Sequence, residues 1–504
     1  MYVFAVVVAA VLACLVAMQF GAWAPPRLFA ASGFISKTLC SGLFVSHRRA
    51  ETIQQYDIQP SGGYFANVFL VRVEKDRVTS SLFGLGLYAK TAIYHSKKFG
   101  CYMASDDYPP LPTVAEEEQK EDVIPLEADQ NPALQQFIAE YEFSDAAFAA
   151  NQSRALVVVH RGRVVGEQYQ DKMLGIGPTT RLHSWSMAKT IHAVAVLHRM
   201  ASSVGLALDT PVGLEDFDPV RRDFIVNTLN RGLNVTFRDL MGMSDVLQMA
   251  EKYELGEGVS DMLFSQGDSA AFASRSVGKP SSPAVSPSDT CRLGWFYSSG
   301  VSNVLAKEFR RTFPSHEAYV KYMMDDFLGK IGSSFTFEMD ASGTFVGSSF
   351  VYATARDFAR FGLFLLQEQQ RPLLELLQQP HCDSGGLYSS TASVWLNPSR
   401  LSPAPTDVNL TGRQDWQRFH WMTKSLPSDC FMLSGYAGQL LLVCPSLELV
   451  VVRLGYSFDG PVGGDEQDDN FSRARLMRGI LHRLGLKSKY YNKVDARENK
   501  NNFS

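Results

Sequence analysis

The chain has 504 residues, of which 45% are hydrophobic and 20% are charged, so it is long enough for a large core and for more than one domain. Its net charge is −4 and its basic residues are dispersed, which gives no electrostatic basis for binding nucleic acid. The sequence has no Cys-x-x-Cys pair, no clustered histidines at metal-ligand spacing and no glycine-rich phosphate loop. We therefore predict neither a metal site nor a cofactor.

The first 24 residues form a hydrophobic N-terminal segment. Every residue from Tyr2 to Met18 is apolar, and the first basic residue is Arg27. This pattern predicts a membrane-spanning anchor or the core of a signal peptide. We favour an uncleaved anchor, because a basic leader is missing and Pro25 would follow directly on the cleavage site.

The side of the membrane on which the rest of the chain lies stays open at this point. The basic residues Arg27, Lys37, Arg48 and Arg49 favour the cytoplasm by the positive-inside rule. The glycosylation sequons at Asn151, Asn234, Asn409, Asn470 and Asn502 favour the outside. An even set of cysteines follows the anchor and permits three disulfides, although buried free thiols are an equal alternative: Cys40, Cys101, Cys291, Cys382, Cys430 and Cys444.

The remaining chain divides by composition into four regions. Residues 25–108 form an N-terminal region with a predicted strand at residues 69–74. A linker rich in proline and glutamate occupies residues 109–131. The main domain is predicted over residues 132–486, and a polar tail follows over residues 487–504.

The main domain carries strand signals at both of its ends. Residues 155–160 and 164–169 alternate as a hairpin, and residues 439–444 and 449–453 form a second hairpin. Helical periodicity marks residues 186–200, 355–366 and 472–484. Because terminal strands can join into one sheet, we predict an α+β fold in which an antiparallel sheet is flanked by helices, with a mostly helical second lobe. A cleft between the lobes is the expected place for a site.

A serine and a lysine stand three residues apart where the helix over residues 186–200 begins. Ser186 and Lys189 share one face of that helix, so the amine can accept or steer the serine proton. The free N–H groups of a helix N-terminus also favour a developing oxyanion. An ordinary N-cap serine is the alternative. A second Ser-x-x-Lys, at residues 276–279, lies in a polar loop with no apolar helix after it, and we interpret it as accidental.

Two further sequence motifs follow Ser186 and Lys189 along the chain. Trp295-Phe296-Tyr297-Ser298-Ser299-Gly300 comes first, and Phe431-Met432-Leu433-Ser434-Gly435-Tyr436-Ala437-Gly438-Gln439 opens the last hairpin. With Ser186 and Lys189, these strings resemble the three motifs of the serine β-lactamase and penicillin-binding-protein family. The likeness is to its branch of class C β-lactamases, esterases and 6-aminohexanoate-oligomer hydrolases. It covers about residues 150–485, and segments 236–241, 347–349 and 354–362 add to it.

The resemblance implies a role for each matching residue. Ser186 is the expected nucleophile, Lys189 keeps its proton mobile, and Tyr297 returns a proton to the leaving group. The backbone N–H groups of Ser186 and Gln439 are the expected oxyanion donors. Gly438, Tyr436 and Ser299 are the other residues expected to contact substrate.

Two departures from the family pattern affect the substrate. Ser299 stands where an asparagine completes the second motif, although Asn303 lies one helical turn on. Tyr436 stands where a lysine or histidine begins the third motif. Lysine and arginine are the usual partners of a substrate carboxylate. We therefore expect a small-molecule or peptide-like substrate with an ester or amide bond and little negative charge.

Residues 39–46 resemble the N-terminal part of anchored bacterial members of the family, which implies a membrane-anchored protein with an extracytoplasmic catalytic domain, or a secreted one. A disulfide between Cys40 and Cys101 would agree with that location. The competing hypothesis for function is a non-catalytic member of the fold that binds a ligand or organises a partner. An α/β-hydrolase is a weaker alternative, because the chain has no Gly-x-Ser-x-Gly elbow.

Overall fold

The structure is a computed structural model, and most of the chain from Pro25 onward can be described. The described residues are 25–63, 65–112, 123–203, 205–213, 215–219, 222–223, 234–244, 247, 249–275, 293–397, 399, 422, 425–457 and 473–486. The predicted anchor over residues 1–24, the second Ser-x-x-Lys and the polar tail lie outside these residues.

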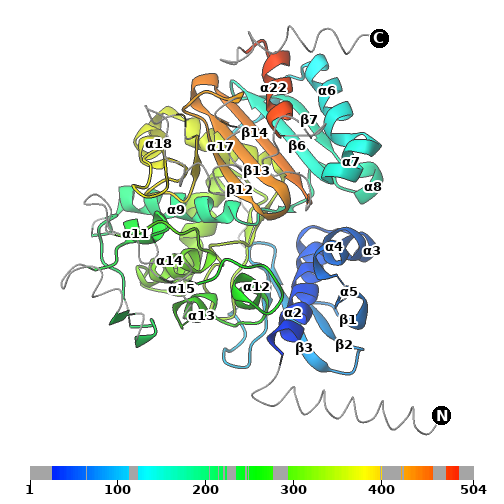
Figure 1. The fold of residues 1–504 in the computed structure, drawn as a ribbon, viewed down its shortest axis with the longest axis vertical. Helices are drawn as coiled ribbons and strands as arrows, with labels where there is room; N and C mark the ends of the chain where they lie inside the picture. The colour runs from blue at the N-terminus through cyan, green and yellow to red at the C-terminus, as the bar shows by residue number, and fades with distance from the viewer. Residues whose placement is uncertain are drawn as a thin grey trace.

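A seven-stranded sheet forms the centre of the main domain (Figure 1). Its order is β11-β12-β13-β14-β6-β7-β5, and all neighbours are antiparallel except β5 and β7. Both predicted hairpins are present, and β14 joins them by pairing with β6, with Val451 opposite Val158. The strands are β5 (Glu127–Ala128), β6 (Ser153–His160), β7 (Arg163–Tyr169), β11 (Trp395–Leu396), β12 (Phe431–Gly435), β13 (Gln439–Cys444) and β14 (Leu449–Gly455).

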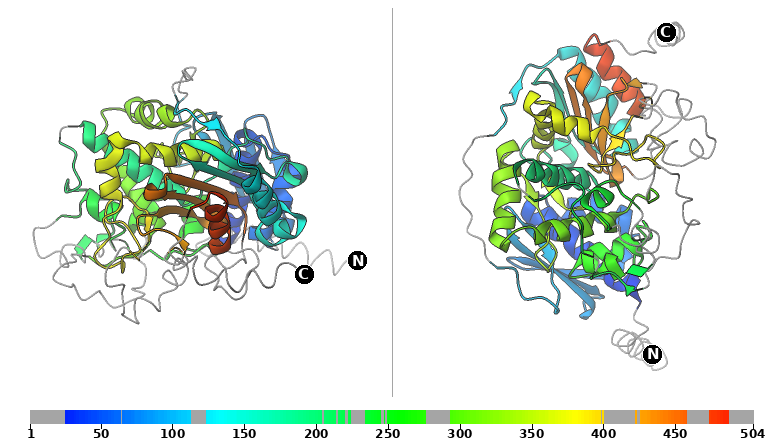
Figure 2. Two further views of the ribbon diagram at one scale, coloured as in Figure 1. Left: turned by 90° about the horizontal axis from the view of Figure 1, so that it is seen from above. Right: turned by 90° about the vertical axis from the view of Figure 1, so that its left-hand side faces the viewer.

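Helices cover both faces of this sheet, as the two views in Figure 2 show. One face carries α9 (Met187–Ser202) and α17 (Ala355–Leu366), and the other carries α6 (Pro132–Phe143) and α22 (Arg473–Arg483). Helix α17 lies so close that a Cβ added at Gly362 would approach Val450 Cγ1 to 2.5 Å. Short elements surround them: α7 (Asp145–Asn151), α8 (Asp171–Leu174), η4 (Glu368–Gln370), α18 (Arg371–Leu377), η6 (Tyr436–Gly438) and η7 (Pro445–Leu447).

A helical lobe packs below the sheet as drawn in Figure 1. It contains α11 (Phe237–Met241), α12 (Gly258–Phe264), α13 (Ser269–Arg275), α14 (Ser299–Arg311), α15 (His316–Lys321), η3 (Tyr322–Leu328) and α16 (Gly329–Ile331). A three-stranded sheet of order β8-β10-β9 supports it, formed by β8 (Leu182–His183), β9 (Thr336–Phe337) and β10 (Val351–Ala353). The predicted α+β architecture, with an antiparallel sheet, flanking helices and a helical lobe, is confirmed.

The N-terminal region folds around its own four-stranded sheet. That sheet has the order β1-β2-β3-β4, and α2 packs on it and on α12 of the helical lobe. Its elements are α2 (Pro26–Cys40), η1 (Ser41–Val45), α3 (Ala50–Ile53), η2 (Gln54–Ile58), α4 (Gln59–Gly62), α5 (Phe65–Val68), β1 (Phe69–Val73), β2 (Arg77–Leu82), β3 (Leu87–Ser96) and β4 (Gly100–Met103). A disulfide between Cys40 and Cys101 joins the end of α2 to β4.

One helix among the described residues is long and apolar enough to cross a membrane, and it is the continuous helix Pro26–Val45. However, 72% of its most apolar stretch is buried inside the protein. It carries Lys37, whose side chain is buried and forms an ion pair with Glu338 beside β9. In this structure Pro26–Val45 is therefore a core helix.

The N-terminal region and the main domain share one core. The buried apolar side chains form a continuous cluster that includes Ala31 in α2 and Leu481 in α22. Two buried ion-pair groups also cross between them: Lys37 with Glu338, and Asp57 with both Arg48 and Arg154.

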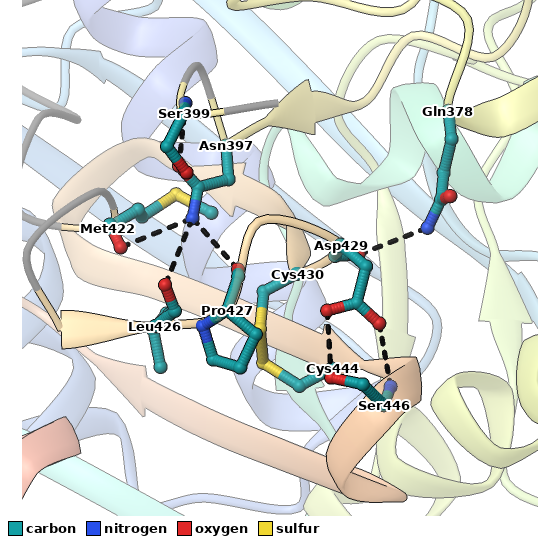
Figure 3. Close-up of a disulfide and its surroundings, with 10 residues drawn as sticks. All are labelled: Gln378, Asn397, Ser399, Met422, Leu426, Pro427, Asp429, Cys430, Cys444 and Ser446. Atoms are coloured by element: carbon teal, nitrogen blue, oxygen red, sulfur yellow. Dashed lines mark hydrogen bonds between the residues drawn. A yellow bond between two sulfur atoms is a disulfide. The ribbon is translucent and has the colours of Figure 1, made fainter. Parts of the chain in front are cut away.

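The far end of the β12–β13 hairpin is held by a second disulfide, Cys430–Cys444 (Figure 3). Beside it, the Asp429 carboxylate accepts hydrogen bonds from the Ser446 backbone N–H at 2.6 Å and from the Ser446 hydroxyl at 2.9 Å. Asn397 donates from Nδ2 to the Pro427 carbonyl at 2.9 Å. Cys382 is also disulfide-bonded. The disulfide Cys430–Cys444 and the bonds of Asp429 fix the hairpin at the end opposite the turn that carries residues 436–438.

Candidate active site

Ser186 lies at the N-terminus of α9, on a turn with unusual backbone geometry. The preceding residue, Trp185, has a positive φ of 46°, and Ser184 is tied to β10 by a 2.8 Å bond from its N–H to the Val351 carbonyl. Ser186 occupies the N-cap position of α9, but its hydroxyl makes no capping hydrogen bond. The hydroxyl instead faces Lys189, one helical turn on. The position is that of an N-cap serine, but the side chain does not make the bond that defines an N-cap.

Lys189 is buried, with 1% of its surface exposed, and all three donors of its ammonium group have acceptors. Its Nζ donates to Ser186 Oγ at 2.9 Å, to Ser299 Oγ at 3.0 Å and to the Ser348 carbonyl at 3.2 Å. The first two of these acceptors come from the first and second motifs. The third comes from segment 347–349, one of the supporting strings.

The second motif lies beside Lys189, at the start of α14. Ser299 is the first residue of that helix and contacts Lys189 directly. The Tyr297 ring centroid lies 4.8 Å from Lys189 Nζ, and the ring stacks on Trp395 at 5.3 Å. Asn303 does not take the place of the missing asparagine here: its Oδ1 accepts from the Ser348 N–H at 3.1 Å and so positions segment 347–349.

Two further residues of the site come from the segment before α12, and the motifs did not identify them. Glu251 accepts a hydrogen bond from the Ser299 hydroxyl at 2.5 Å and another from the Ser299 N–H at 2.7 Å. The Tyr253 side chain lies near Ser186 and Lys189, which both act on the pKa of its hydroxyl, and its ring stacks on Tyr436. Both residues belong to a short polar stretch without motif or periodicity, so local sequence carried no signal for them.

Burial and neighbouring charges set the protonation of Glu251 and Tyr253. Burial raises the pKa of Glu251 above its ordinary value, although the positive charge of Lys189 and the bonds from Ser299 oppose the shift. Burial and the nearby Glu251 carboxylate raise the pKa of Tyr253, so it stays a neutral hydroxyl at physiological pH. Tyr253 is therefore a hydrogen-bond donor in this site rather than a base.

The third motif forms the turn of the β12–β13 hairpin and lies against the turn that precedes α9. A Cβ added at Gly435 would lie 2.3 Å from the Ser184 carbonyl oxygen, so only glycine allows the hairpin this close. The Tyr436 ring stacks on Tyr253 at 4.9 Å and meets the edge of Trp185 at 5.1 Å. Tyr436 therefore forms part of the aromatic wall next to Ser186.

Gly438 and Gln439 shape the same turn. Gly438 has φ of +92°, and its carbonyl accepts from Arg453 Nη1 at 2.9 Å. The Gln439 side chain spans the turn, because its Nε2 donates to the Gly455 carbonyl at 2.7 Å and its Oε1 accepts from the Gly455 N–H at 3.1 Å. The Gln439 side chain is thus structural, and the oxyanion role of its backbone N–H stays a prediction.

The histidines near the first motif lie outside this group of residues. His192 is 1% exposed, packs against Phe309 and Phe337, and has no hydrogen-bond partner at either ring nitrogen. Burial lowers the pKa of His192 to about 3, so it is neutral at physiological pH. Among the residues that the structure describes, no group of three or more His, Cys, Asp or Glu side chains could hold a metal ion.

No family model and no curated protein matches this sequence. The chain is similar to solved structures, and three of them illustrate the range. A protein assigned as a 6-aminohexanoate-dimer hydrolase from Bacillus anthracis is 16% identical, with a TM-score of 0.43 over 73% of this chain and 90% of that one. A penicillin-binding protein homolog from Caulobacter crescentus is 13% identical, with a TM-score of 0.45 over 71% and 98% of the two chains.

A class C β-lactamase from Rhodobacter sphaeroides is 15% identical, with a TM-score of 0.40 over 70% of this chain and 98% of that one. These are the classes of protein that the three motifs resemble.

Proposed function

We propose that the protein is a serine hydrolase that cleaves an ester or amide bond through an acyl-enzyme on Ser186. The observation that carries the proposal is the buried contact of 2.9 Å between Lys189 Nζ and Ser186 Oγ at a helix N-terminus. A serine hydroxyl needs such a neighbour to become a nucleophile. The second motif contacts the same lysine through Ser299, and the third motif lies next to Ser186 through the contact of Tyr436 with Trp185.

A route for the lysine proton supports a role for Lys189 as the base. Lys189 donates to Ser299 Oγ, and the Ser299 hydroxyl donates to Glu251. A proton passed along these two bonds leaves a neutral amine on Lys189 and a protonated Glu251. The amine then takes the Ser186 proton as Oγ attacks the substrate carbonyl carbon, and the lysine is an ammonium again.

Two tyrosines are candidates to protonate the leaving group. The Tyr297 ring lies against Lys189, and the Tyr253 side chain lies near Ser186. Either hydroxyl can donate to the departing oxygen or nitrogen as the carbonyl bond breaks, and can then recover a proton from Lys189. The oxyanion formed in between is assigned to the backbone N–H groups of Ser186 and Gln439.

The walls of the site favour a substrate with little negative charge. The turn that carries the third motif reads Tyr436-Ala437-Gly438-Gln439 and brings no cation to the site. Glu251 adds a carboxylate nearby, and an anionic substrate would be repelled while that group is ionised. We therefore propose neutral esters or amides with an apolar or aromatic acyl group.

Disulfides support an extracytoplasmic location for the catalytic part. Cys40–Cys101 and Cys430–Cys444 are bridged, and Cys382 is disulfide-bonded as well. Such bonds persist in oxidising compartments and are rare in the cytosol. The anchor over residues 1–24 would then hold the protein at the outer side of a membrane, and without it the protein would be secreted.

The test is hydrolysis of a panel of activated esters, amides and a chromogenic cephalosporin by the full chain. We expect Ser186→Ala and Lys189→Met to lower kcat/KM by at least about 10³-fold. A fluorophosphonate probe should leave an adduct on Ser186 in the mass spectrum. Ser202→Ala, at the other end of the same helix, is the matched control and should keep full activity.

A folded protein that shows no turnover and no adduct would contradict the proposal. That result would favour the competing hypothesis, a non-catalytic protein that binds a ligand or a partner through this fold.

If the protein is active, the variants Tyr253→Phe and Tyr297→Phe distinguish the two candidate acids. The variant that loses more activity on amides than on activated esters identifies the leaving-group donor, because an amine departs only when protonated.

A further inference from the structure

A small cavity lies between the N-terminal region and the main domain, behind the nucleophile turn. Its volume is about 40 Å³, and the N-terminal region contributes Lys37, Arg48 and Asp57 to its lining. Arg154 on β6 and Trp185, the residue before Ser186, also line it, and the other polar lining residues are Thr38, Ser46, His183, Tyr352 and Tyr456. A cavity needs about 10–15 Å³ on this measure to admit one water, so there is room for a single small ion.

Three buried hydrogen-bond donors on this wall have no acceptor. They are Arg48 Nε, Arg154 Nε and the indole Nε1 of Trp185. All three residues are more than nine-tenths buried, with exposed fractions of 7%, 6% and 4%. Buried polar groups are almost always paired, and leaving one unpaired costs about 1–3 kcal/mol. Because all three orphan atoms are donors, the missing partner is an acceptor.

The charge around the cavity is also unbalanced. Lys37 pairs with Glu338, while Arg48 and Arg154 share the single carboxylate of Asp57. Three buried cations therefore face two carboxylates, which leaves an excess of one positive charge. Burial, followed by the positive charge of Arg48, works against protonation of Arg154, and its pKa is lowered despite the contact with Asp57. A buried uncompensated charge is strongly unfavourable.

We propose that this cavity is a binding site for one small monovalent anion of the chloride class. Such an ion accepts from all three donors and cancels the excess charge. A water molecule can accept only two hydrogen bonds, needs acceptors for its own two protons, and does not cancel the excess charge. The bound anion would tie Arg48 of the N-terminal region and Arg154 of the central sheet to Trp185 and so would stabilise the turn that presents Ser186.

The proposal is independent of the catalytic chemistry and is tested on the full chain by thermal unfolding. At constant ionic strength, replacing sodium gluconate by sodium chloride should raise Tm by roughly 2 °C in a saturable manner. Gluconate is too large for the cavity. Arg48→Met should abolish the shift, while Arg238→Met, which removes an exposed partner of Asp209, should leave it unchanged.

A crystal grown in sodium bromide provides a second measurement that needs no variant. The expected result is an anomalous peak in contact with Arg48, Arg154 and Trp185. Water density in the cavity together with no chloride-specific change in Tm overturns the proposal. A bromide peak without any shift in solution also contradicts it, because the ion would then be adventitious.

Discussion

Glu251 shows how a single side chain can set the behaviour of the proposed site. It contacts neither Ser186 nor Lys189 through a hydrogen bond of its own, and it acts through the Ser299 hydroxyl. The serine at position 299 is what makes this possible, because a hydroxyl both accepts from Lys189 and donates to a carboxylate. The serine at position 299 and the Glu251 carboxylate therefore act together, as two parts of one proton route.

Glu251→Gln tests this proton route. The carboxylate must be ionised to accept a proton, and burial raises its pKa. Activity should therefore fall as pH drops through that raised pKa, so the acid limb of kcat/KM should lie above pH 4.5, the ordinary value for glutamate. In Glu251→Gln we expect kcat to fall about 10- to 100-fold and this limb to disappear.

The control is Glu254→Gln, an exposed carboxylate in the same segment. Its pH profile should match that of the unmodified protein. An unchanged acid limb in Glu251→Gln would mean that another group accepts the proton.

The β12–β13 hairpin is the element that brings the third motif to the proposed nucleophile, Ser186. The disulfide Cys430–Cys444 and the bonds around Asp429 hold one end, and Arg453 and Gln439 hold the turn at the other. The approach of Gly435 to the Ser184 carbonyl sets the distance between the hairpin and the turn before α9.

Gly435→Ala should push the hairpin away from Ser186. The new Cβ would lie 2.3 Å from the Ser184 carbonyl oxygen, and backbone atoms on both sides must move. We expect the free energy of unfolding to fall by about 1–3 kcal/mol, as for other overpacked sites. We also expect kcat/KM to drop at least about tenfold, because small misplacements of reacting groups are costly.

Urea unfolding and ester hydrolysis measure the two effects. Gly177→Ala is the matched control, since a Cβ there has nothing within 4 Å, and it should change neither quantity much. Full activity in Gly435→Ala would show that the hairpin does not set the geometry of the site.

At the scale of the whole molecule, the N-terminal region is packed into the same core as the main domain rather than attached as an appendage. Helix α2 packs against its own sheet and against α12, and the ion pair of Lys37 with Glu338 is buried to 2% and 0% exposure. Glu338 also accepts from the Ser41 hydroxyl at 2.7 Å and the Cys101 N–H at 2.8 Å. The boundaries predicted for the linker and the main domain stay predictions.

Lys37→Met tests this integration. Removing the cation leaves Glu338 buried without its ion-pair partner, and the free energy of unfolding should fall by about 3–5 kcal/mol. Adding Glu338→Gln removes the stranded charge and should restore part of that loss. Guanidinium unfolding under non-reducing conditions measures both variants, and a cost below about 1 kcal/mol for Lys37→Met would contradict a buried, structural ion pair.

Local patterns in the sequence determined much of the architecture. The alternation in residues 155–169 and 439–453 predicted both hairpins, and helical spacing predicted α9, α17 and α22 close to their observed bounds. Ser186 and Lys189 were predictable as neighbours because residues three apart on a helix share a face. Such features depend on residues that are close in the chain, so the sequence alone contains the information.

Only the tertiary structure decided which distant residues meet. Glu251 and Tyr253 look like any polar loop residues until the helical lobe brings them to Ser299 and Ser186. The apolar composition of Pro26–Val45 suits a core helix and a membrane helix equally, and burial against the four-stranded sheet distinguishes the two. The cavity behind Trp185 brings together Arg48, Arg154 and Trp185, which come from three separate segments. Packing between residues far apart in the sequence creates these features, so local periodicity cannot predict them.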